Sequence, residues 1–367
     1  MKDGYKHLGE YIRQVDIRNT DGKEENLLGV SVQKQFIPSI ANTVGTDFTK
    51  YKVVKKGQFT YIPDTSRRGD KIGIALLKDY EEGLVSNVYT VFEVVDAEKL
   101  LPEYLMLWFS RPEFDRYARF KSHGSVREVF DWNEMCMVEL PVLAIEEQRK
   151  IVKAYKAITD RIALKKQIND NLEATAQAIY KKLFVEDVDI SELPQDWKLT
   201  ALENVASLSA GGDRPSVYSS FPTNICTVPI FSNGIDEEGL YGYTDKAKIF
   251  DESVTVSARG TVGYVFLREE PYVPIVRLIS VIPKTEYVTA KYLYFALASI
   301  DLHSTGTSQQ QITVPDFKQR LIVVPDRMTM DTFTKFIEPI FSKIKQNKSE
   351  IQSLLGLQAS FLALLSR

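Results

Sequence analysis

The chain has 367 residues and a formal net charge of −3, with 44% hydrophobic and 26% charged residues. This composition is typical of a globular protein with room for two ordinary domains, and the slight negative charge excludes an indiscriminate polyanion binder. No apolar run reaches the roughly 20 residues of a membrane-spanning helix, and the first residues lack a signal-peptide core, so we expect a cytoplasmic protein without membrane contact.

The first 143 residues predict a mixed α/β domain. Short β-branched or aromatic segments, separated by Gly and Pro, indicate strands, and helical spacing of apolar residues follows at 102–119. A polar loop at 121–127 and a strand-like segment at 135–140 complete this domain. The predicted strands are 30–33, 52–54, 58–62, 72–77 and 88–95.

A long helix is predicted at 144–185. Its apolar residues recur at steps of three and four, as in Ile151, Tyr155, Ile158 and Ile162. Forty helical residues span about 60 Å, which is too long for a surface helix of one compact domain. Such a helix needs a partner to cover its apolar stripe.

A linker and a second domain follow. Residues 186–196 contain five acidic and no basic side chains, and end in a Leu-Pro step typical of a solvated linker. Residues 197–328 again predict strands, a helix at 290–302, a polar loop at 304–311 and a strand at 321–325. A second long helix is predicted at 329–367.

The two halves are an internal repeat. Tyr104-Leu105 matches Tyr292-Leu293 at an offset of 188, and Pro141 matches Pro325 at 184. Similar matches link the polar loops, the strands that open each domain and the ends of the long helices. Several matches in one order at nearly one offset indicate a duplicated plan.

The two helices predict an antiparallel coiled coil. We therefore expect an α+β fold with two similar domains, separated by paired helices and related by a pseudo-two-fold axis. Asn169 and Asn347 interrupt the apolar stripes, and such residues can fix helix register. The alternative is two amphipathic helices that each pack on their own domain. The expected contact positions are Ile158, Ile162, Asn169, Leu172, Ile344, Asn347, Ile351 and Leu354.

Catalytic motifs are missing from the sequence. The three histidines are not at metal-ligand spacing from one another or from a cysteine, and no phosphate-binding loop or methyltransferase motif is present. We therefore expect no catalytic residue, no metal site and no cofactor in this chain. A free-standing enzyme is the less favoured alternative.

Polar, basic and aromatic residues of the loops are candidates for DNA contacts, because Gln and Asn pair with adenine and Arg pairs with guanine. Residues 42–78 carry eight basic and three acidic side chains, a local charge of +5. The simpler interpretation is that each such residue belongs to a solvated face. The first-domain candidates are Gln33, Lys34, Gln35, Tyr61, Arg67, Arg68, Lys71, Ser125 and Arg127. The second-domain candidates are Asn233, Tyr241, Tyr243, Arg259, Thr261, Ser308, Gln309, Gln310 and Gln311.

This plan resembles the specificity subunit of type I restriction–modification systems. The junction Leu140-Pro-Val-Leu-Ala-Ile-Glu-Glu-Gln-Arg-Lys-Ile151 resembles the start of that family's first long helix, and Ser257-Ala-Arg-Gly-Thr-Val-Gly263 resembles a segment of its target-recognition domains. The second junction, Val324 to Phe333, lacks the Glu-Gln pair.

The resemblance implies a non-catalytic DNA-binding subunit. Each target-recognition domain would read one half of a bipartite double-stranded DNA sequence, and the helices would set the spacer. Two methyltransferase subunits would dock on the chain and use S-adenosylmethionine, while two restriction/translocase subunits would use ATP and Mg. The alternative function is a non-catalytic two-domain coiled-coil scaffold that binds other proteins.

Overall fold

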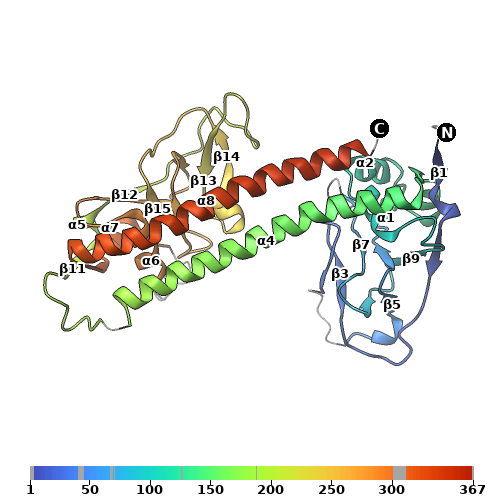
Figure 1. Ribbon diagram of the computed structural model, residues 1–367, viewed down its shortest axis with the longest axis horizontal. Coiled ribbons are helices and arrows are strands. Elements are labelled where there is room, and N and C mark those ends of the chain that lie inside the picture. Colours follow the sequence, from blue (N-terminus) through green and yellow to red (C-terminus); the bar gives the residue numbers. More distant parts are fainter. Residues whose placement is uncertain are drawn as a thin grey trace. The chain divides into compact units, whose positions relative to one another are not determined.

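The computed structural model describes residues 4–39, 45–66, 69, 71–124, 127–186, 188–300 and 311–365 (Figure 1). The chain forms two compact units. Unit 1 consists of Met1–Lys165 and Ser349–Arg367, and unit 2 consists of Lys166–Lys348. Each unit therefore contains part of both long helices, α4 (Ile145–Phe184) and α8 (Arg327–Leu364).

Unit 1 is built on a four-stranded antiparallel sheet of order β2-β9-β6-β7. These strands are β2 (Ile12–Val15), β9 (Thr90–Val94), β6 (Phe59–Tyr61) and β7 (Ile74–Leu76). Three two-stranded sheets pair β1 (Tyr5–His7) with β10 (Glu139–Pro141), β3 (Leu28–Val30) with β4 (Phe36–Pro38), and β5 (Lys52–Lys55) with β8 (Glu82–Val85). The short helices are η1 (Leu8–Glu10), η2 (Phe48–Lys50), α1 (Pro102–Phe109), α2 (Pro112–Phe120) and α3 (Trp132–Cys136).

Unit 2 repeats this plan with a sheet of order β12-β18-β15-β16. These strands are β12 (Ala206–Ala210), β18 (Ile279–Pro283), β15 (Ser253–Val256) and β16 (Val265–Arg268). A two-stranded sheet pairs β11 (Lys198–Ala201) with β19 (Leu321–Val324), and a three-stranded sheet contains β14 (Leu240–Thr244), β13 (Val228–Phe231) and β17 (Val273–Pro274). The short helices are α5 (Leu202–Val205), η3 (Asp236–Gly239), α6 (Ala290–Ala298) and α7 (Val314–Lys318).

The predicted internal repeat is confirmed by strand order. In unit 1 the first strand in sequence, β2, pairs with the last, β9, and β9 also pairs with the hairpin β6–β7. In unit 2 the corresponding strands are β12, β18 and the hairpin β15–β16. The strand that opens each unit also pairs with the strand immediately before a long helix. Antiparallel sheets of short strands explain why the sequence alternates short β-branched segments with Gly and Pro.

Each main sheet buries one face against aromatic residues. In unit 1 the rings of Phe59 and Phe92 stack with centroids 4.9 Å apart, and Phe109 of α1 meets Phe59 edge-on at 5.8 Å. In unit 2 the core includes residues from both long helices. Phe184 of α4 lies 5.2 Å from Phe333 of α8, measured between ring centroids. The helices therefore contribute directly to the hydrophobic core of unit 2.

The helices also pack on each other, and they run antiparallel. In unit 1 the rings of Tyr155 and Phe361 lie 5.8 Å apart, and in unit 2 Asn169 bonds to Asn347. The contact nearer the C-terminus of α4 is thus the contact nearer the N-terminus of α8, which is the antiparallel arrangement. The predicted coiled coil is confirmed, and the alternative of two helices that contact only their own domains is wrong. Of the eight expected contact positions, Ile162, Ile344, Asn347 and Ile351 are buried, and Ile158, Asn169, Leu172 and Leu354 are half-buried.

Three local predictions need correction. The predicted strand 30–33 overlaps β3 only at Val30, because a turn follows in which the N–H of Lys34 donates to the carbonyl of Ser31 at 3.1 Å. The predicted helix 102–119 is two helices, because Pro112 cannot continue α1 and instead opens α2. The predicted strand 135–140 begins as α3, because the Asp131 carboxylate accepts a hydrogen bond from the backbone N–H of Glu134 and caps a helix there. Of the described helices, none is both long enough and apolar enough to cross a membrane.

Candidate nucleic-acid interface

Several loops of unit 2 leave the main sheet at one end. Ala210 ends β12, Val256 ends β15, and both pair with Ile279, the first residue of β18. Val265 starts β16 and pairs with Val256. The segments 211–214, 257–264 and 275–278 therefore begin or end at the same edge of the sheet. We call this edge and its loops the loop end of unit 2.

Asn233 braces two of these loops. Its Nδ2 donates to the carbonyl of Val276 at 2.7 Å, and its Oδ1 accepts from the N–H of Ala258 at 2.7 Å. Both polar atoms of the amide thus have partners within the protein. Asn233 therefore positions the loops that surround it, and its contact with a base stays a prediction.

Arg259 and Gln311, two of the predicted DNA contacts, come together at the loop end. Both are exposed, and Arg259 Nη2 lies 3.3 Å from Gln311 Oε1. A backbone hydrogen bond from Ile312 to Ala258 at 3.0 Å holds the two segments side by side. Thr261 is in the same loop with a buried hydroxyl oxygen, and its contact with DNA stays a prediction. Ser308, Gln309 and Gln310 lie outside the described residues.

The tyrosines of β14 belong to an aromatic surface. Tyr241 is 44% exposed, and its ring lies 5.6 Å from that of Tyr218. The guanidinium of Arg214 lies over Tyr218 at 4.7 Å, a cation–π distance. Tyr243 is half-buried. Sequence reasoning missed Arg214, although its position just after the Gly211-Gly212 pair was a usable signal for a loop contact.

Unit 1 has an equivalent loop end. Tyr61 ends β6 and pairs with both Thr90 and Ile74, so the segments 62–73 and 86–89 share one edge of the sheet. A backbone bond from Phe130 to Pro63 at 2.9 Å matches the bond from Ile312 to Ala258. The described candidates Lys71 and Arg127 are exposed, while Arg67, Arg68 and Ser125 lie outside the described residues.

The hairpins at the two loop ends contain the same Arg-Gly step. Gly69 precedes the first residue of β7 by five positions, and Gly260 precedes the first residue of β16 by five. Both glycines have positive φ, +63° and +70°. Each unit thus has a left-handed glycine five residues before the second strand of its hairpin, and in the sequence an arginine precedes each of these glycines.

Two first-domain candidates lie in the protein interior. Tyr61 is 0% exposed beside Phe92, and burial raises the pKa of its phenol, so its assignment as a DNA contact is corrected. The Lys34 side chain is 9% exposed and its Nζ is 2.5 Å from Asp115 Oδ1 on α2. Burial lowers the pKa of Lys34, partly offset by Asp115. Lys34 therefore forms a structural ion pair with Asp115, whereas its neighbours Gln33 and Gln35 are exposed.

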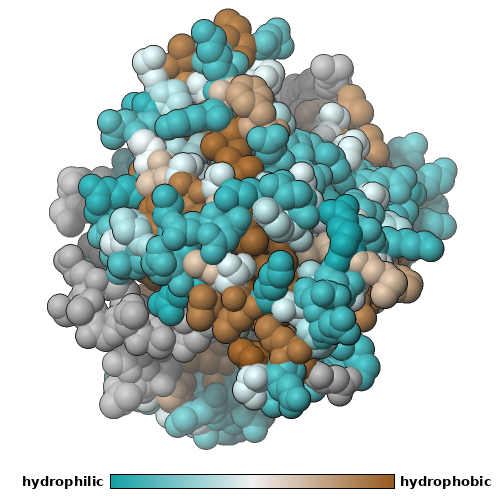
Figure 2. All heavy atoms as spheres, turned by 90° about the vertical axis from the view of Figure 1, so that its left-hand side faces the viewer, coloured by the Kyte–Doolittle hydropathy of each residue, from teal (hydrophilic) through white to brown (hydrophobic). Residues whose placement is uncertain are grey.

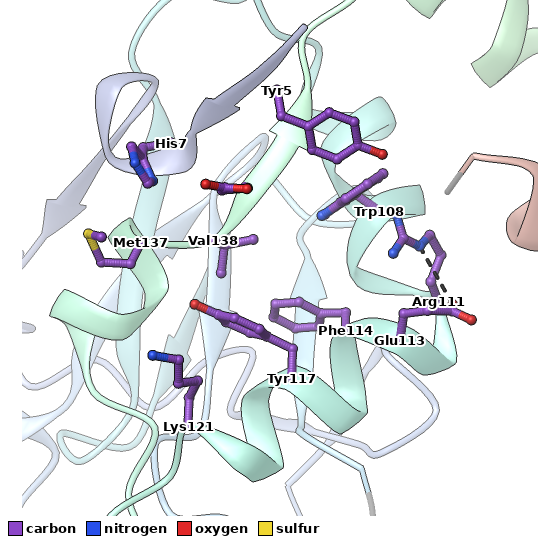
Figure 3. A pocket seen from close by; sticks show the side chains of 11 residues that line it. Tyr5, His7, Trp108, Arg111, Glu113, Phe114, Tyr117, Lys121, Met137 and Val138 are labelled. Atoms are coloured by element: carbon purple, nitrogen blue, oxygen red, sulfur yellow. Dashed lines mark ion pairs between the residues drawn. The ribbon is translucent and has the colours of Figure 1, made fainter. Parts of the chain in front are cut away.

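A separate pocket of about 510 Å³ opens beside β1 in unit 1 (Figure 3). The Arg111 guanidinium lies 3.5 Å from the ring centre of Trp108, and Arg111 Nε is 3.7 Å from Glu113 Oε2. Burial lowers the pKa of Arg111, and the Glu113 charge opposes this shift. None of the predicted DNA-contacting residues lines this pocket, so it is not part of either loop end.

The opposite end of the unit 2 sheet presents apolar side chains. Leu321 is 57% exposed on β19, Met328 is 77% exposed at the start of α8, and Leu199 of β11 is 42% exposed. Figure 2 views the side of the molecule where these elements lie and shows brown apolar residues among hydrophilic ones. Exposed apolar residues that form a contiguous patch are typical of a protein-interaction surface.

Known proteins share both the sequence and the fold. A Mycoplasma pneumoniae protein named as a type I specificity subunit is 32% identical over 148 residues, which is 40% of either chain. The HindI specificity subunit of Haemophilus influenzae is 22% identical across 84% of this chain and 85% of its own. The matched segment thus spans about two fifths of the Mycoplasma relative.

A solved structure has the same fold. The S subunit of a type I restriction–modification system from M. genitalium matches 98% of this chain and 95% of its own, with a TM-score of 0.59 and 14% identity. The model of the type I restriction modification DNA specificity domain matches twice, at residues 10–174 and 194–354. These two matches include most of both units, and the chain therefore belongs to the family of type I restriction–modification DNA specificity proteins.

Proposed function

We propose that this chain is the DNA sequence-specificity subunit of a type I restriction–modification complex. Each unit reads one half of a bipartite double-stranded DNA target. The single observation that carries this proposal is the duplicated sheet with an equivalent loop end in each unit. Two similar recognition units in one chain can each bind one half of a bipartite DNA sequence.

The loop ends have the chemistry for DNA recognition. Exposed Arg259 and Gln311 can bind base edges, and Lys71 and Arg127 can bind base edges or phosphates. The net charge of the chain is only −3, so we infer that partner subunits supply part of the phosphate neutralisation.

The paired helices provide the spacer in this proposal. Because the two recognition sheets are connected through α4 and α8, the length of the helix pair limits the separation of the two half-sites. A 40-residue helix is about 60 Å long, enough to separate two readers by at least one turn of DNA.

Catalysis belongs to the partners. We propose that two methyltransferase subunits dock on this chain and methylate adenine with S-adenosylmethionine, and that two restriction/translocase subunits use ATP and Mg. The exposed Leu199, Leu321 and Met328 support a docking role for the start of α8. This chain itself would be non-catalytic.

Co-expression with a methyltransferase partner, followed by methylome sequencing, tests the proposal. We expect one bipartite motif with adenine methylated in each half. A functional methyltransferase that yields no bipartite motif with this chain would reject the specificity role. The scaffold alternative predicts instead that the complex does not bind DNA and gives no salt-dependent shift in a gel assay.

A further inference from the structure

The turn between β17 and β18 has an unusual backbone. Val276 and Arg277 both have positive φ, 53° and 61°, and the N–H of Leu278 closes the turn on the carbonyl of Ile275 at 3.0 Å. A β-branched residue such as valine is rarely left-handed, because its side chain crowds the backbone there. The surrounding structure must therefore hold this turn in place.

Three contacts hold the turn. The N–H of Val276 donates to Gly212 at 2.8 Å, and that of Arg277 donates to Gly211 at 3.0 Å. Asn233 binds the carbonyl of Val276 from another loop. Gly211 permits this approach, because a Cβ there would lie 2.7 Å from the backbone nitrogen of Ile275. The turn is thus fixed by two neighbouring segments.

This turn carries an exposed cation. Arg277 is exposed, and among the described residues the structure shows no ion pair for its guanidinium. The Asn233 amide joins Val276 to Ala258, the residues before Arg277 and Arg259, so the two arginines come from adjacent backbone positions. A surface arginine that only increases solubility does not require a fixed backbone. The fixed turn at Arg277 therefore indicates that the direction of its side chain matters.

The equivalent turn of unit 1 has different chemistry. The N–H of Tyr89 closes it on the carbonyl of Ser86 at 3.0 Å, just before β9. Its tip is Asn87-Val88, neither residue has positive φ, and Val88 is 67% exposed. The two units therefore present different side chains from one place in a shared framework.

We propose that Arg277 is a specificity-determining residue that reads a guanine in the half-site recognised by unit 2. An arginine fork can bind O6 and N7 of guanine together, and a rigid turn would orient it before DNA arrives. This inference rests on the proposed function and adds a residue and a base to it. Val88 is the counterpart in unit 1 and gives that half-site a different preference.

The test uses the complex with methyltransferase subunits and a duplex that contains its methylated motif. Binding is measured at fixed salt for the cognate duplex, for duplexes changed at each G·C pair of the unit 2 half-site, and for unrelated DNA. R277A and R277G are compared with wild type. Glycine suits the left-handed backbone, so R277G preserves the turn even where alanine strains it. The matched control is R13A, because Arg13 is an exposed arginine on β2 (66% side-chain exposure) and belongs to unit 1, which does not read this half-site.

We expect R277A and R277G to weaken cognate binding about 10- to 100-fold and to lose discrimination at one G·C pair. R13A should match wild type at every G·C pair of this half-site. An equal loss on cognate and unrelated DNA would identify a phosphate contact and overturn base reading. If wild type distinguishes the duplexes and R277G distinguishes them equally well, the role of Arg277 is rejected while the proposed function stands. A wild-type complex that binds all duplexes equally would instead reject the proposed function together with the inference.

Discussion

Asn347 of α8 donates a hydrogen bond from Nδ2 to Oδ1 of Asn169 on α4, at 2.8 Å, and Asn347 is 0% exposed. Two amides thus meet in the contact between the helices. Nearby, Arg161 and Lys165 both pair with Glu350, with Lys165 Nζ 2.8 Å from Oε2. A polar pair of this kind favours one helix register over its neighbours.

The Asn pair leads to a prediction for stability. N347L should lower the free energy of unfolding by about 1–3 kcal/mol, because it leaves the Asn169 amide without its partner. The double variant N169L/N347L should recover most of this loss, since two apolar residues suit the contact. Urea unfolding of the full chain measures both. Equal losses in the single and double variants would show that the pair is not coupled.

The carboxylate of Asp326 caps α8 and joins it to Trp197, the residue before β11. It accepts from the backbone N–H of Thr329 at 2.9 Å and from Nε1 of Trp197 at 2.9 Å. We expect D326A to cost about 1–2 kcal/mol through the lost helix cap. D331A is the control, because Asp331 is 59% exposed in a surface pair that contributes little.

The same carboxylate predicts a pH dependence. Hydrogen bonds from the Thr329 side chain and backbone hold the pKa of Asp326 below its usual 3.8. The stabilisation is therefore complete above pH 3.8 and is lost as pH falls through the folded-state value. The difference in unfolding free energy between wild type and D326A should shrink in that acid range, and a constant difference would contradict the assignment.

Removing only one partner of the buried Lys34–Asp115 ion pair should lower the free energy of unfolding. K34M should destabilise the protein by about 3–5 kcal/mol, because Asp115 keeps a buried charge. K34M/D115L should lose less. Because burial lowers the pKa of Lys34, the folded state binds fewer protons, so wild-type stability should rise relative to K34M as pH approaches 10.5. Unfolding curves from pH 7 to 10 check this slope.

The Arg-Gly hairpins predict separate effects on the two half-sites. R67A/R68A should weaken recognition of the half-site read by unit 1 by about 1–3 kcal/mol, and R259A should do the same for unit 2. Each variant should leave the other half of the methylated motif unchanged. Methylome sequencing and competition binding reveal both effects. Unchanged affinity together with an unchanged motif would remove these arginines from the interface.

The helix pair predicts a change in spacer length. Fourteen residues separate Tyr155 from Asn169 on α4, and fourteen separate Asn347 from Phe361 on α8. Deleting 158–164 together with 351–357 keeps both contacts in phase and shortens the pair by about 10 Å. The motif should then lose about three base pairs of spacer, with both half-sites unchanged.

Deleting a single turn from Ile158 to Ile162 in α4 alone is the contrasting case. This deletion changes the phase of α4 against α8, so it should shift the spacer or break assembly. A motif of unaltered spacing in the heptad variant would contradict the spacer role of the helices.

The sequence predicted the long helices and the repeat because those features depend on periodicity and on matched positions along the chain. It could not separate Tyr61 from surface tyrosines, since alternation along a three-residue strand does not reveal which faces are covered. Lys34 was misassigned for a similar reason: its partner Asp115 is 81 residues away in the sequence. The brace by Asn233 and the turn at Arg277 depend on loops brought together only by sheet register.

Unit 1 is assembled from both ends of the described chain. Phe361 contacts Tyr155, and Leu365 packs against the core that contains Leu8 and Phe59. During synthesis, the ribosome must therefore release almost the whole chain before the first recognition sheet gains its last packing partners. Unit 2, which is continuous in sequence, can finish folding earlier. A premature stop in the last two heptads would thus damage the unit encoded first.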